Sequence, residues 1–296
     1  MTQSKELQQW VDPAMFRSEP MPETEGGVSP KVYLLSATPD PLGAIAAASK
    51  MYKGEVVRSL MDVTDEERRH FWIESQKTHL RAPHEYVDFH FMIEGVTRSF
   101  THQLVRQRTA VYSQESLRFA VKEGFADEVP LPPSLIGLDR EDTTDIQLWE
   151  ETVETIEHAY ERLVAGGMPA EDARGLLPHS ITTRVHYKTN LLGLVHHAGN
   201  RLCTQAQFEW RFVFNEIVRA IREYDSYGTL WNKWQFEEIA DSNLFRPVCY
   251  AQGKCPFNAD FDRDCTIRPR VEEGKFDEIE TSEWLLDPAA ARRGVG

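Results

Sequence analysis

The sequence predicts an α+β fold, in which a small antiparallel or mixed sheet is flanked by helices and followed by a helical portion. Three short segments at residues 31–36, 86–93 and 180–188 alternate in polarity or are rich in β-branched side chains, as strands are. The segments around them place apolar side chains three or four residues apart, as amphipathic helices do. Neither a Gly-x-Gly-x-x-Gly turn nor a P-loop sequence occurs, so a Rossmann or P-loop nucleotide site is not supported.

Strands and helices alternate in the first half of the chain. We expect a strand at 31–36, helices at 41–52 and 64–78, a strand at 86–93 and a helix at 97–108. The second helix begins with Thr64-Asp-Glu-Glu67, the capping-box pattern, in which each side chain accepts a hydrogen bond from the other residue's backbone. The second strand has one strongly apolar face, and Gly95 is expected to end it.

The second half begins with an acidic stretch that contains several prolines. Residues 121–147 are expected to form a surface excursion, because proline interrupts regular elements. Helices are expected at 147–166, 169–176 and 190–201, with the strand at 180–188 among them. Thr204 is expected to cap a long amphipathic helix that ends near Tyr224, and its apolar face could pack in the core or against another subunit.

Composition divides the chain into three parts. Residues 1–30 read as an extended arm, residues 31–240 as the main folded domain and residues 241–296 as an irregular tail. The tail contains three of the four cysteines, Cys249, Cys255 and Cys265, and Cys203 precedes it. A zinc site would need a fourth ligand, and no histidine follows His197. Cys203 could supply that ligand by folding back, but nothing in the sequence requires this, so we expect reduced thiols and no metal.

Bulk properties limit the class of protein. Apolar residues make up 41% of the chain and charged residues 27%, as in globular proteins. No apolar run approaches the roughly 20 residues that span a bilayer, and the N-terminus lacks the apolar core of a secretory signal, so a cytoplasmic protein without membrane contact is expected. The net charge of −14 argues against general nucleic-acid binding, but a local arginine cluster is enough to hold a small phosphorylated ligand.

Such a cluster lies between Gln103 and Arg118. It contains three arginines and one acidic residue, Glu115, and it is rich in amide and hydroxyl side chains. The arginines could form a solvated group at a helix end, where cations are favoured. The shortage of local carboxylates, and the many side chains that both donate and accept hydrogen bonds, instead favour a planar ligand that carries a phosphate, such as a nucleotide.

The spacing of this segment resembles a known signature. Arg106-Gln-Arg108, followed by seven residues and then Ser116, is similar to the Arg-His-Arg, seven residues, Ser signature of the flavin-dependent thymidylate synthases (ThyX). Further matches are found at 94–98, 102–106, Leu177-Pro178, Thr183-Arg184, Thr189-Asn190, Arg201 and 206–209. The resemblance covers roughly residues 31–225, and it implies a ThyX-like fold with residues 31–240 as the catalytic domain.

The resemblance also implies an activity and a set of site residues. The family methylates dUMP reductively to dTMP with FAD, NADPH as electron donor and methylenetetrahydrofolate as one-carbon donor. The residues implied for FAD are Arg106, Gln107, Arg108, Gln114, Asn190 and His196. Those implied for dUMP are Gln103, Arg106, Gln114, Glu115, Ser116, Leu117, Arg118, Arg184 and Arg201. Relatives assemble as homotetramers with shared active sites.

Three of these residues have particular roles by resemblance. Arg118 and Arg184 are the candidates for the dUMP phosphate. Arg201 is the catalytic candidate, because a guanidinium against the uracil would favour its ionised form. Ser116 would bind or polarise the substrate, although a serine at this position could also simply cap a helix.

Two positions depart from the family pattern. Gln107 replaces the central histidine of the signature, and Gln114 stands where many relatives carry a glutamate. Glutamine keeps a hydrogen-bond donor and an acceptor but cannot become charged. The alternatives are therefore a ThyX-like pyrimidine nucleotide hydroxymethylase or other one-carbon transferase, and a catalytically inactive nucleotide-binding relative.

Overall fold

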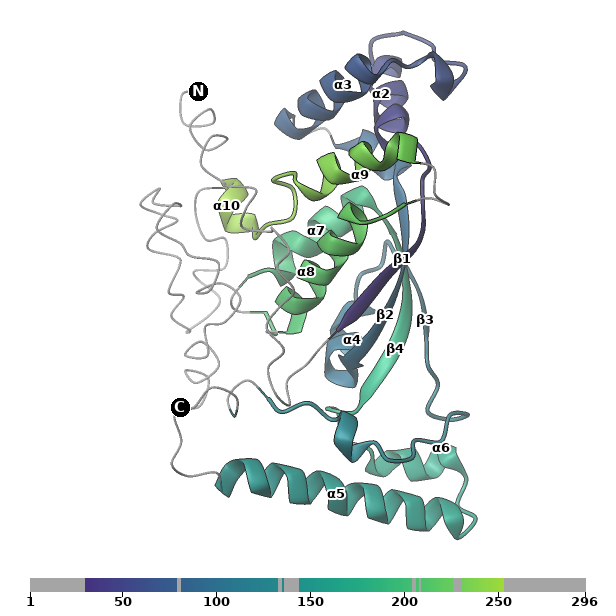
Figure 1. The fold of residues 1–296 in the computed structure, drawn as a ribbon, viewed down its shortest axis with the longest axis vertical. Coiled ribbons are helices and arrows are strands. Elements are labelled where there is room, and N and C mark those ends of the chain that lie inside the picture. Colours follow the sequence, from purple (N-terminus) through teal and green to yellow (C-terminus); the bar gives the residue numbers. More distant parts are fainter. Residues whose placement is uncertain are drawn as a thin grey trace.

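The protein has the α+β fold that the sequence predicts (Figure 1). The computed structural model describes residues 30–78, 81–132, 135, 144–203, 206–207, 209–225 and 230–252. In this part of the chain a four-stranded antiparallel sheet has the order β1-β2-β4-β3. The strands are β1 (Lys31–Ala37), β2 (Asp88–Thr97), β3 (Val111–Gln114) and β4 (Thr182–Asn190).

The helices in the described part of the chain cover one face of this sheet (Figure 1). The covering helices are α4 (Arg98–Leu104), α7 (Leu191–Arg201) and α8 (Glu209–Arg222). Around the upper end of the sheet lie α2 (Pro41–Met51), α3 (Asp65–Lys77), α9 (Lys233–Ala240) and α10 (Val248–Gln252), and at the lower end lie α5 (Thr144–Ala165) and α6 (Ala170–Ala173). Short 3₁₀ turns occur at 60–62, 82–86, 126–128, 174–176 and 230–232.

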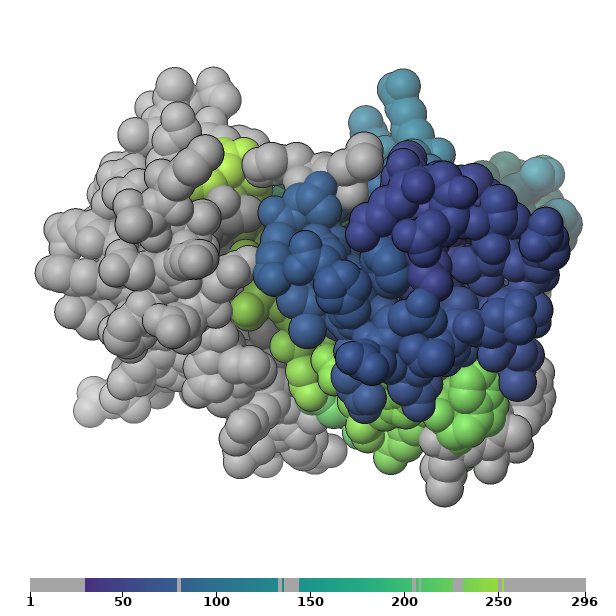
Figure 2. Space-filling view, turned by 90° about the horizontal axis from the view of Figure 1, so that it is seen from above, coloured from purple at the N-terminus to yellow at the C-terminus, as the bar shows by residue number. Residues whose placement is uncertain are grey.

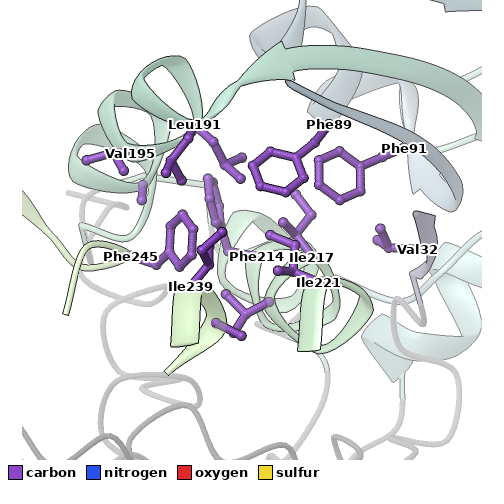
Figure 3. Packing of buried hydrophobic residues seen from close by; sticks show 14 of the residues in the cluster. Val32, Phe89, Phe91, Leu191, Val195, Phe214, Ile217, Ile221, Ile239 and Phe245 are labelled. Carbon is purple, nitrogen blue, oxygen red and sulfur yellow. The ribbon is translucent and has the colours of Figure 1, made fainter. Parts of the chain in front are cut away.

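The main core forms between the covered face of the sheet and the helices α7 and α8 (Figure 3). Alternation along β2 directs Phe89, Phe91 and Ile93 into this core, where each is fully buried. Phe214 and Ile217 of α8 pack against them from the helix side. Burial of a large apolar side chain stabilises a fold by roughly 1.5–3 kcal/mol, so this layer supplies most of the driving force that orients the helices.

A second, smaller core lies beneath the sheet around α5. Phe125 and Tyr160 are buried in it, with their rings 6.1 Å apart in an edge-to-face contact. The backbone N–H of Ala126 donates to Glu157 Oε1 at 2.7 Å, and that of Gly124 donates to Glu161 Oε1 at 3.2 Å. The start of the acidic stretch at 121–147 is thus anchored on α5, although the sequence indicated only a surface excursion.

The α2–α3 pair closes the upper end of the molecule (Figure 2). The capping box predicted at Thr64 and Glu67 is confirmed at the start of α3. Arg68 then joins the two helices, because its Nε and Nη2 donate to the carboxylate of Asp40, the N-cap of α2, at 2.9 and 2.6 Å. Among the described helices, none is long and apolar enough to cross a membrane.

Two boundaries differ from the sequence prediction. Strand β2 does not end at Gly95 but continues to Thr97, because a shift in register between Ile93 and Val96 accommodates Gly95 at a φ of 70°. Glycine adopts this left-handed conformation without a steric penalty. The helix predicted at 97–108 ends at Leu104. Residues 105–110 then lead into β3, a strand that the sequence analysis did not predict.

The C-terminal elements also differ from expectation. Helix α8 begins at Glu209 instead of near Thr204, and Thr204 itself lies outside the described residues. The apolar face of α8 packs in the core of the chain, which is one of the two alternatives stated for this helix. After residue 240, Leu244 and Phe245 enter the main core and α10 follows, where no helix was predicted.

The core packing leads to a stability prediction. Phe214→Ala should lower the free energy of unfolding by about 3–5 kcal/mol, because Phe214 is fully buried and its removal leaves a cavity. Met61→Ala is the control, since Met61 is 85% exposed and its loss should change stability by less than about 0.5 kcal/mol. Urea unfolding followed by circular dichroism measures both. Equal effects of the two substitutions would contradict this description of the core.

Candidate functional site

The side chain of Gln103, near the end of α4, lies at the centre of a hydrogen-bonded network. Its Oε1 accepts from Arg201 Nη1 at 3.0 Å and from Trp210 Nε1 at 3.1 Å. Its Nε2 donates to Gln207 Oε1 at 2.8 Å, and Gln207 Nε2 donates in turn to Glu209 Oε2 at 3.0 Å. The network therefore connects α4, the end of α7 and the start of α8.

Glu209 is the buried end of this network. It is the first residue of α8 and is fully buried. Its Oε1 accepts from the backbone N–H of Thr97, and its Oε2 accepts from Thr97 Oγ1, both at 2.7 Å. Burial raises the pKa of Glu209 to about 7, although the bonds from Thr97 act in the opposite direction. Because Thr97 also ends β2 and caps α4, the carboxylate is tied to the sheet.

Arg201 provides a cation that no carboxylate neutralises in the described part of the chain. Its guanidinium lies 5.3 Å from the centre of the Trp210 ring, a cation–π contact. Burial lowers the pKa of Arg201, but a guanidinium remains protonated at neutral pH. The neighbouring His197 is neutral, because burial and the charge of Arg201 lower its pKa to about 3. The site therefore presents one fixed positive charge.

Gln107 is held against the start of α7. Its Nε2 donates to the carbonyl oxygen of Gly193 at 2.7 Å, and the N-cap residue Asn190 accepts from the N–H of Gly193 at 2.8 Å. A Cβ atom at position 193 would lie 2.6 Å from Thr189 Oγ1 and 3.2 Å from Gln107 Nε2. The absence of a side chain at Gly193 thus allows Gln107 to approach the helix, and two predicted cofactor residues, Gln107 and Asn190, meet at one glycine.

Gln114 and Glu115 lie at the end of β3 and just after it. Gln114 Nε2 donates to Thr101 Oγ1 of α4 at 2.8 Å. Glu115 Oε2 lies 3.0 Å from Lys122 Nζ, and the backbone N–H of Glu115 donates to the carbonyl oxygen of Arg184 at 3.1 Å. The only acidic residue of the arginine segment is therefore already paired with a lysine.

Arg118 has a carboxylate partner that is distant in sequence. Its Nε and Nη2 donate to Glu171 Oε2 of α6 at 2.8 and 2.7 Å. Both side chains are about half exposed, so this ion pair contributes little to stability. Next to it, Leu117 is buried and Ser116 Oγ accepts from the backbone N–H of Arg118 at 3.4 Å. Ser116 thus contacts the backbone of its own turn, and no described helix begins there.

The other three arginines predicted for the site are exposed. Arg106, Arg108 and Arg184 form no ion pair within the described residues. Alternation along β4 places Arg184 on the open face of the sheet, whereas Gln114 lies on the covered face. One chain therefore brings Gln103, Gln107, Gln114 and Arg201 to the helix side and holds Arg184 on the opposite side.

Within the described ranges, no group of three or more His, Cys, Asp or Glu side chains could hold a metal ion. Cys203 and Cys249 are half-buried, while Cys255 and Cys265 lie outside the described residues. His196 is exposed on α7.

Four residues of the network were not predicted as site residues: Thr97, Gln207, Glu209 and Trp210. Gln207 and Glu209 were noted only as part of the resemblance at 206–209, without a role. Their signal in the sequence is weak, because the contacts that bury Glu209 join positions 112 residues apart. In the sequence Glu209 stands between Phe208 and Trp210, and an acidic residue among large apolar ones was the one available indication that a partner exists elsewhere.

Comparison with known proteins identifies the family. The profile described as thymidylate synthase complementing protein matches residues 33–225. This chain belongs to the flavin-dependent thymidylate synthase family. The matched region contains the whole Gln103–Arg201 network and the arginine segment, and it ends before α9.

Individual relatives agree with this family. The flavin-dependent thymidylate synthase of Geobacter sulfurreducens is 33% identical over 196 residues, which cover 65% of this chain and 82% of the relative. That of Clostridium tetani is 31% identical over 250 residues, 77% of this chain and 91% of the relative. A UMP/dUMP methylase, PolB from Streptomyces cacaoi, solved with 5-Br dUMP, has a similar fold, with a TM-score of 0.55 and 20% identity over 66% of this chain and 90% of that one.

The burial of Glu209 predicts a pH dependence of stability. Between its ordinary value of 4.5 and its folded pKa of about 7, the folded protein keeps a proton on Glu209 that the unfolded chain releases. Stability should therefore fall as the pH rises through this window, by up to about 1.4 kcal/mol per pH unit. Glu209→Gln should remove this part of the slope, as measured by urea unfolding between about pH 5 and pH 7.5.

Comparison with the wild type isolates this contribution from those of other groups. His84 and His197, whose folded pKa values are lowered to about 4 and about 3, make stability rise with pH, and they do so equally in both proteins. Glu151→Gln on the exposed side of α5 is the matched control and should retain the wild-type slope. A Glu209→Gln protein with an unchanged slope would show that Glu209 does not titrate in this window.

Proposed function

We propose that this protein is a flavin-dependent thymidylate synthase. In the reaction, dUMP, methylenetetrahydrofolate, NADPH and a proton give dTMP, tetrahydrofolate and NADP⁺. Two findings support this proposal: the chain belongs to the family, and a UMP/dUMP methylase has a similar fold. The observation that carries it is the half-buried Arg201 cation, held by Gln103 and Trp210 with no carboxylate among the described residues to neutralise it.

The residues near α7 fit an FAD cofactor. Arg106 and Arg108 are exposed, and neither forms an ion pair in the described part of the chain, so both guanidinium forks are available for an anionic or carbonyl-bearing ligand. The side-chain amide of Gln107 is held by its hydrogen bond to Gly193, and a Cβ atom at position 193 would lie only 3.2 Å from Gln107 Nε2. Bound FAD would supply the electron transfer, while these side chains bind and orient it. An amide at position 107 can serve this role without a charge.

Arg201 would stabilise negative charge on the pyrimidine. Methylation at C5 requires electron density to move into the uracil ring, and a fixed cation at the ring edge favours that anionic form. The Gln103 and Trp210 contacts hold the guanidinium in place before the substrate arrives. Because these contacts fix the guanidinium beforehand, little reorganisation is needed when the charge develops.

The dUMP phosphate would require a cationic group, and Arg118 and Arg184 are the candidates. The Arg118–Glu171 pair is exposed and weak, so a phosphate dianion can compete for the guanidinium. Arg184 lies on the open face of the sheet, opposite to the Gln103–Arg201 side of the same chain. This separation supports a site shared between subunits of a homotetramer, in which Arg184 of one chain would complete the site of another.

The activity is tested by product identification. Purified protein with dUMP, NADPH and methylenetetrahydrofolate should yield a product with the mass of dTMP. A product that carries hydroxymethyl would instead support the hydroxymethylase alternative, and no product with any pyrimidine nucleotide would support the inactive relative. Arg201→Ala should lower kcat/KM by about 10²–10³, whereas Arg162→Ala on α5 should not change it. Nearly intact turnover by Arg201→Ala would rule out the role of this arginine.

A complementation experiment tests the shared site. Arg184→Ala and Arg201→Ala should each be nearly inactive alone. If one chain supplies Arg184 to the Arg201 of another, mixed assemblies formed by unfolding and refolding the two variants together should regain about a quarter of wild-type activity by random pairing. Mixing with no gain in activity would place both arginines in the site of a single chain.

A further inference from the structure

A carboxylate lies at one end of the hydrogen-bonded network around Gln103, and two donors lie at the other. The ionised Glu209 carboxylate can only accept hydrogen bonds, whereas the guanidinium of Arg201 and the indole of Trp210 can only donate them. The amides of Gln207 and Gln103 lie between these ends. An amide accepts on one side and donates on the other, so the groups at the two ends decide which way each amide is turned.

Three donors converge on the Glu209 carboxylate, as suits its ionised form. Thr97 supplies its backbone N–H to Oε1 and its hydroxyl to Oε2, both at 2.7 Å, and Gln207 Nε2 supplies the third donor at 3.0 Å. Thr97 Oγ1 itself accepts from the backbone N–H of Phe100 at 3.1 Å. Burial raises the pKa of Glu209 to about 7, so the carboxylate is ionised in mildly alkaline solution. Under these conditions Gln207 has to turn its donating side to Glu209.

The direction set by Glu209 passes through two amides to Arg201. Because Gln207 turns Nε2 towards Glu209, its Oε1 is left to accept from Gln103 Nε2 at 2.8 Å. Gln103 therefore turns Oε1 to its other side, where it accepts from Arg201 Nη1 at 3.0 Å and from Trp210 Nε1 at 3.1 Å. Each pair in this chain matches a donor with an acceptor. Turning either amide over would place two donors or two acceptors face to face.

An amide at position 209 could not satisfy the same partners. It has one oxygen in place of two, so one of the donors from Thr97 and Gln207 would meet an N–H group. Such a mismatch costs least where water can reach it. Gln207 and Gln103 are half-buried, whereas Glu209 is fully buried. Gln207 would therefore turn over and place its Nε2 against Gln103 Nε2, which loosens the residue that holds Arg201.

We propose that Glu209 and Gln207 are positioning residues that hold the Arg201 cation in place through Gln103. The effect passes from Glu209 to Arg201 along three successive hydrogen bonds. This role rests on the proposed function, because it serves the reaction assigned to Arg201, whereas the direction of the two amides does not depend on that function. The competing role is that of an anchor alone, in which Glu209 ties the start of α8 to Thr97 and leaves Arg201 unaffected.

Urea unfolding at about pH 8, where Glu209 is ionised, tests the direction of the amides without turnover. Glu209→Gln should lower the urea midpoint of the wild-type protein, because it creates the mismatch. The same substitution should raise the midpoint of a Gln103→Glu protein. There the carboxylate at position 103 accepts from Arg201, Trp210 and the turned Gln207, and Gln207 accepts from the amide at position 209, so donors and acceptors match along the chain. A lowered midpoint in both proteins would overturn the proposal.

A third background separates this effect from repulsion between two carboxylates. In a protein with both Gln103→Glu and Gln207→Met, the amide between positions 103 and 209 is gone, but the charges at these positions remain. Glu209→Gln should then no longer raise the midpoint, because no chain of amides is left to match. A rise of the same size would assign the effect to repulsion and overturn the proposal. Circular dichroism verifies that each variant is folded before urea is added.

Turnover tests whether the chain acts on Arg201. Glu209→Gln should lower kcat/KM by about tenfold, mainly through kcat, because Arg201 is proposed to stabilise charge in the transition state. In an Arg201→Ala protein the same substitution should lower kcat/KM by less than about twofold, since the group that Glu209 positions is absent. Equal losses in the two proteins would show a purely structural role and overturn the proposal.

Gln207→Met separates the chain from the anchor. It removes the connection to Gln103 but keeps both bonds between Thr97 and Glu209, so it should lower kcat/KM by about threefold or more. Wild-type turnover by this variant would contradict the proposal. Glu151→Gln on the exposed side of α5 makes the same change of charge as Glu209→Gln and should retain wild-type turnover. If the protein forms no dTMP at all, the proposed function fails, but the urea results still decide the direction of the amides.

Discussion

The period-two alternation of β2 and β4, the central strands, is the constraint on which the rest of the structure depends. Each strand turns large apolar side chains to one face, Phe89, Phe91 and Ile93 from β2 with Val185 and Tyr187 from β4, and that face can be removed from water only by helices packed across it. Helices α7 and α8 therefore lie side by side on the same face. Their ends then meet α4, and this meeting brings Arg201, Trp210 and Gln103 into contact.

Local patterns predicted most elements of the fold because they depend on neighbouring residues. The capping box of α3 and the N-cap of α7 are determined within four residues of sequence. Strand β3 was missed because its four residues become a strand only through pairing with β4, more than 70 positions later. The end of α4 has a similar cause: the hydroxyl of Tyr112 lies 2.8 Å from the carbonyl oxygen of Leu104 and 3.0 Å from that of Gln107, and its one proton, donated to either, holds the turn there.

The candidate site shows the same division between local and distant information. The segment from Arg106 to Arg118 could be recognised from composition and spacing, since both are local properties. The arrangement of its side chains could not, because Arg118 pairs with Glu171 and Gln103 with Arg201, across 53 and 98 positions. In particular, Gln103 was expected to contact a nucleotide, whereas in this structure its amide already satisfies Arg201, Trp210 and Gln207.

The main core and the cluster around Phe125 and Tyr160 share no residue, and this separation has a consequence for motion. The cluster around Phe125 and Tyr160 is small, and α5 contacts only the nearby α6 and 3₁₀ turns to any extent. Such a unit can open while the sheet and α8 stay folded, because few apolar contacts couple the two. Amide protons of α5 should therefore exchange with solvent through subglobal opening, well before those of β2 and β4. The Arg118–Glu171 contact then links one arginine of the segment from Arg106 to Arg118 to the part of the molecule that opens most easily.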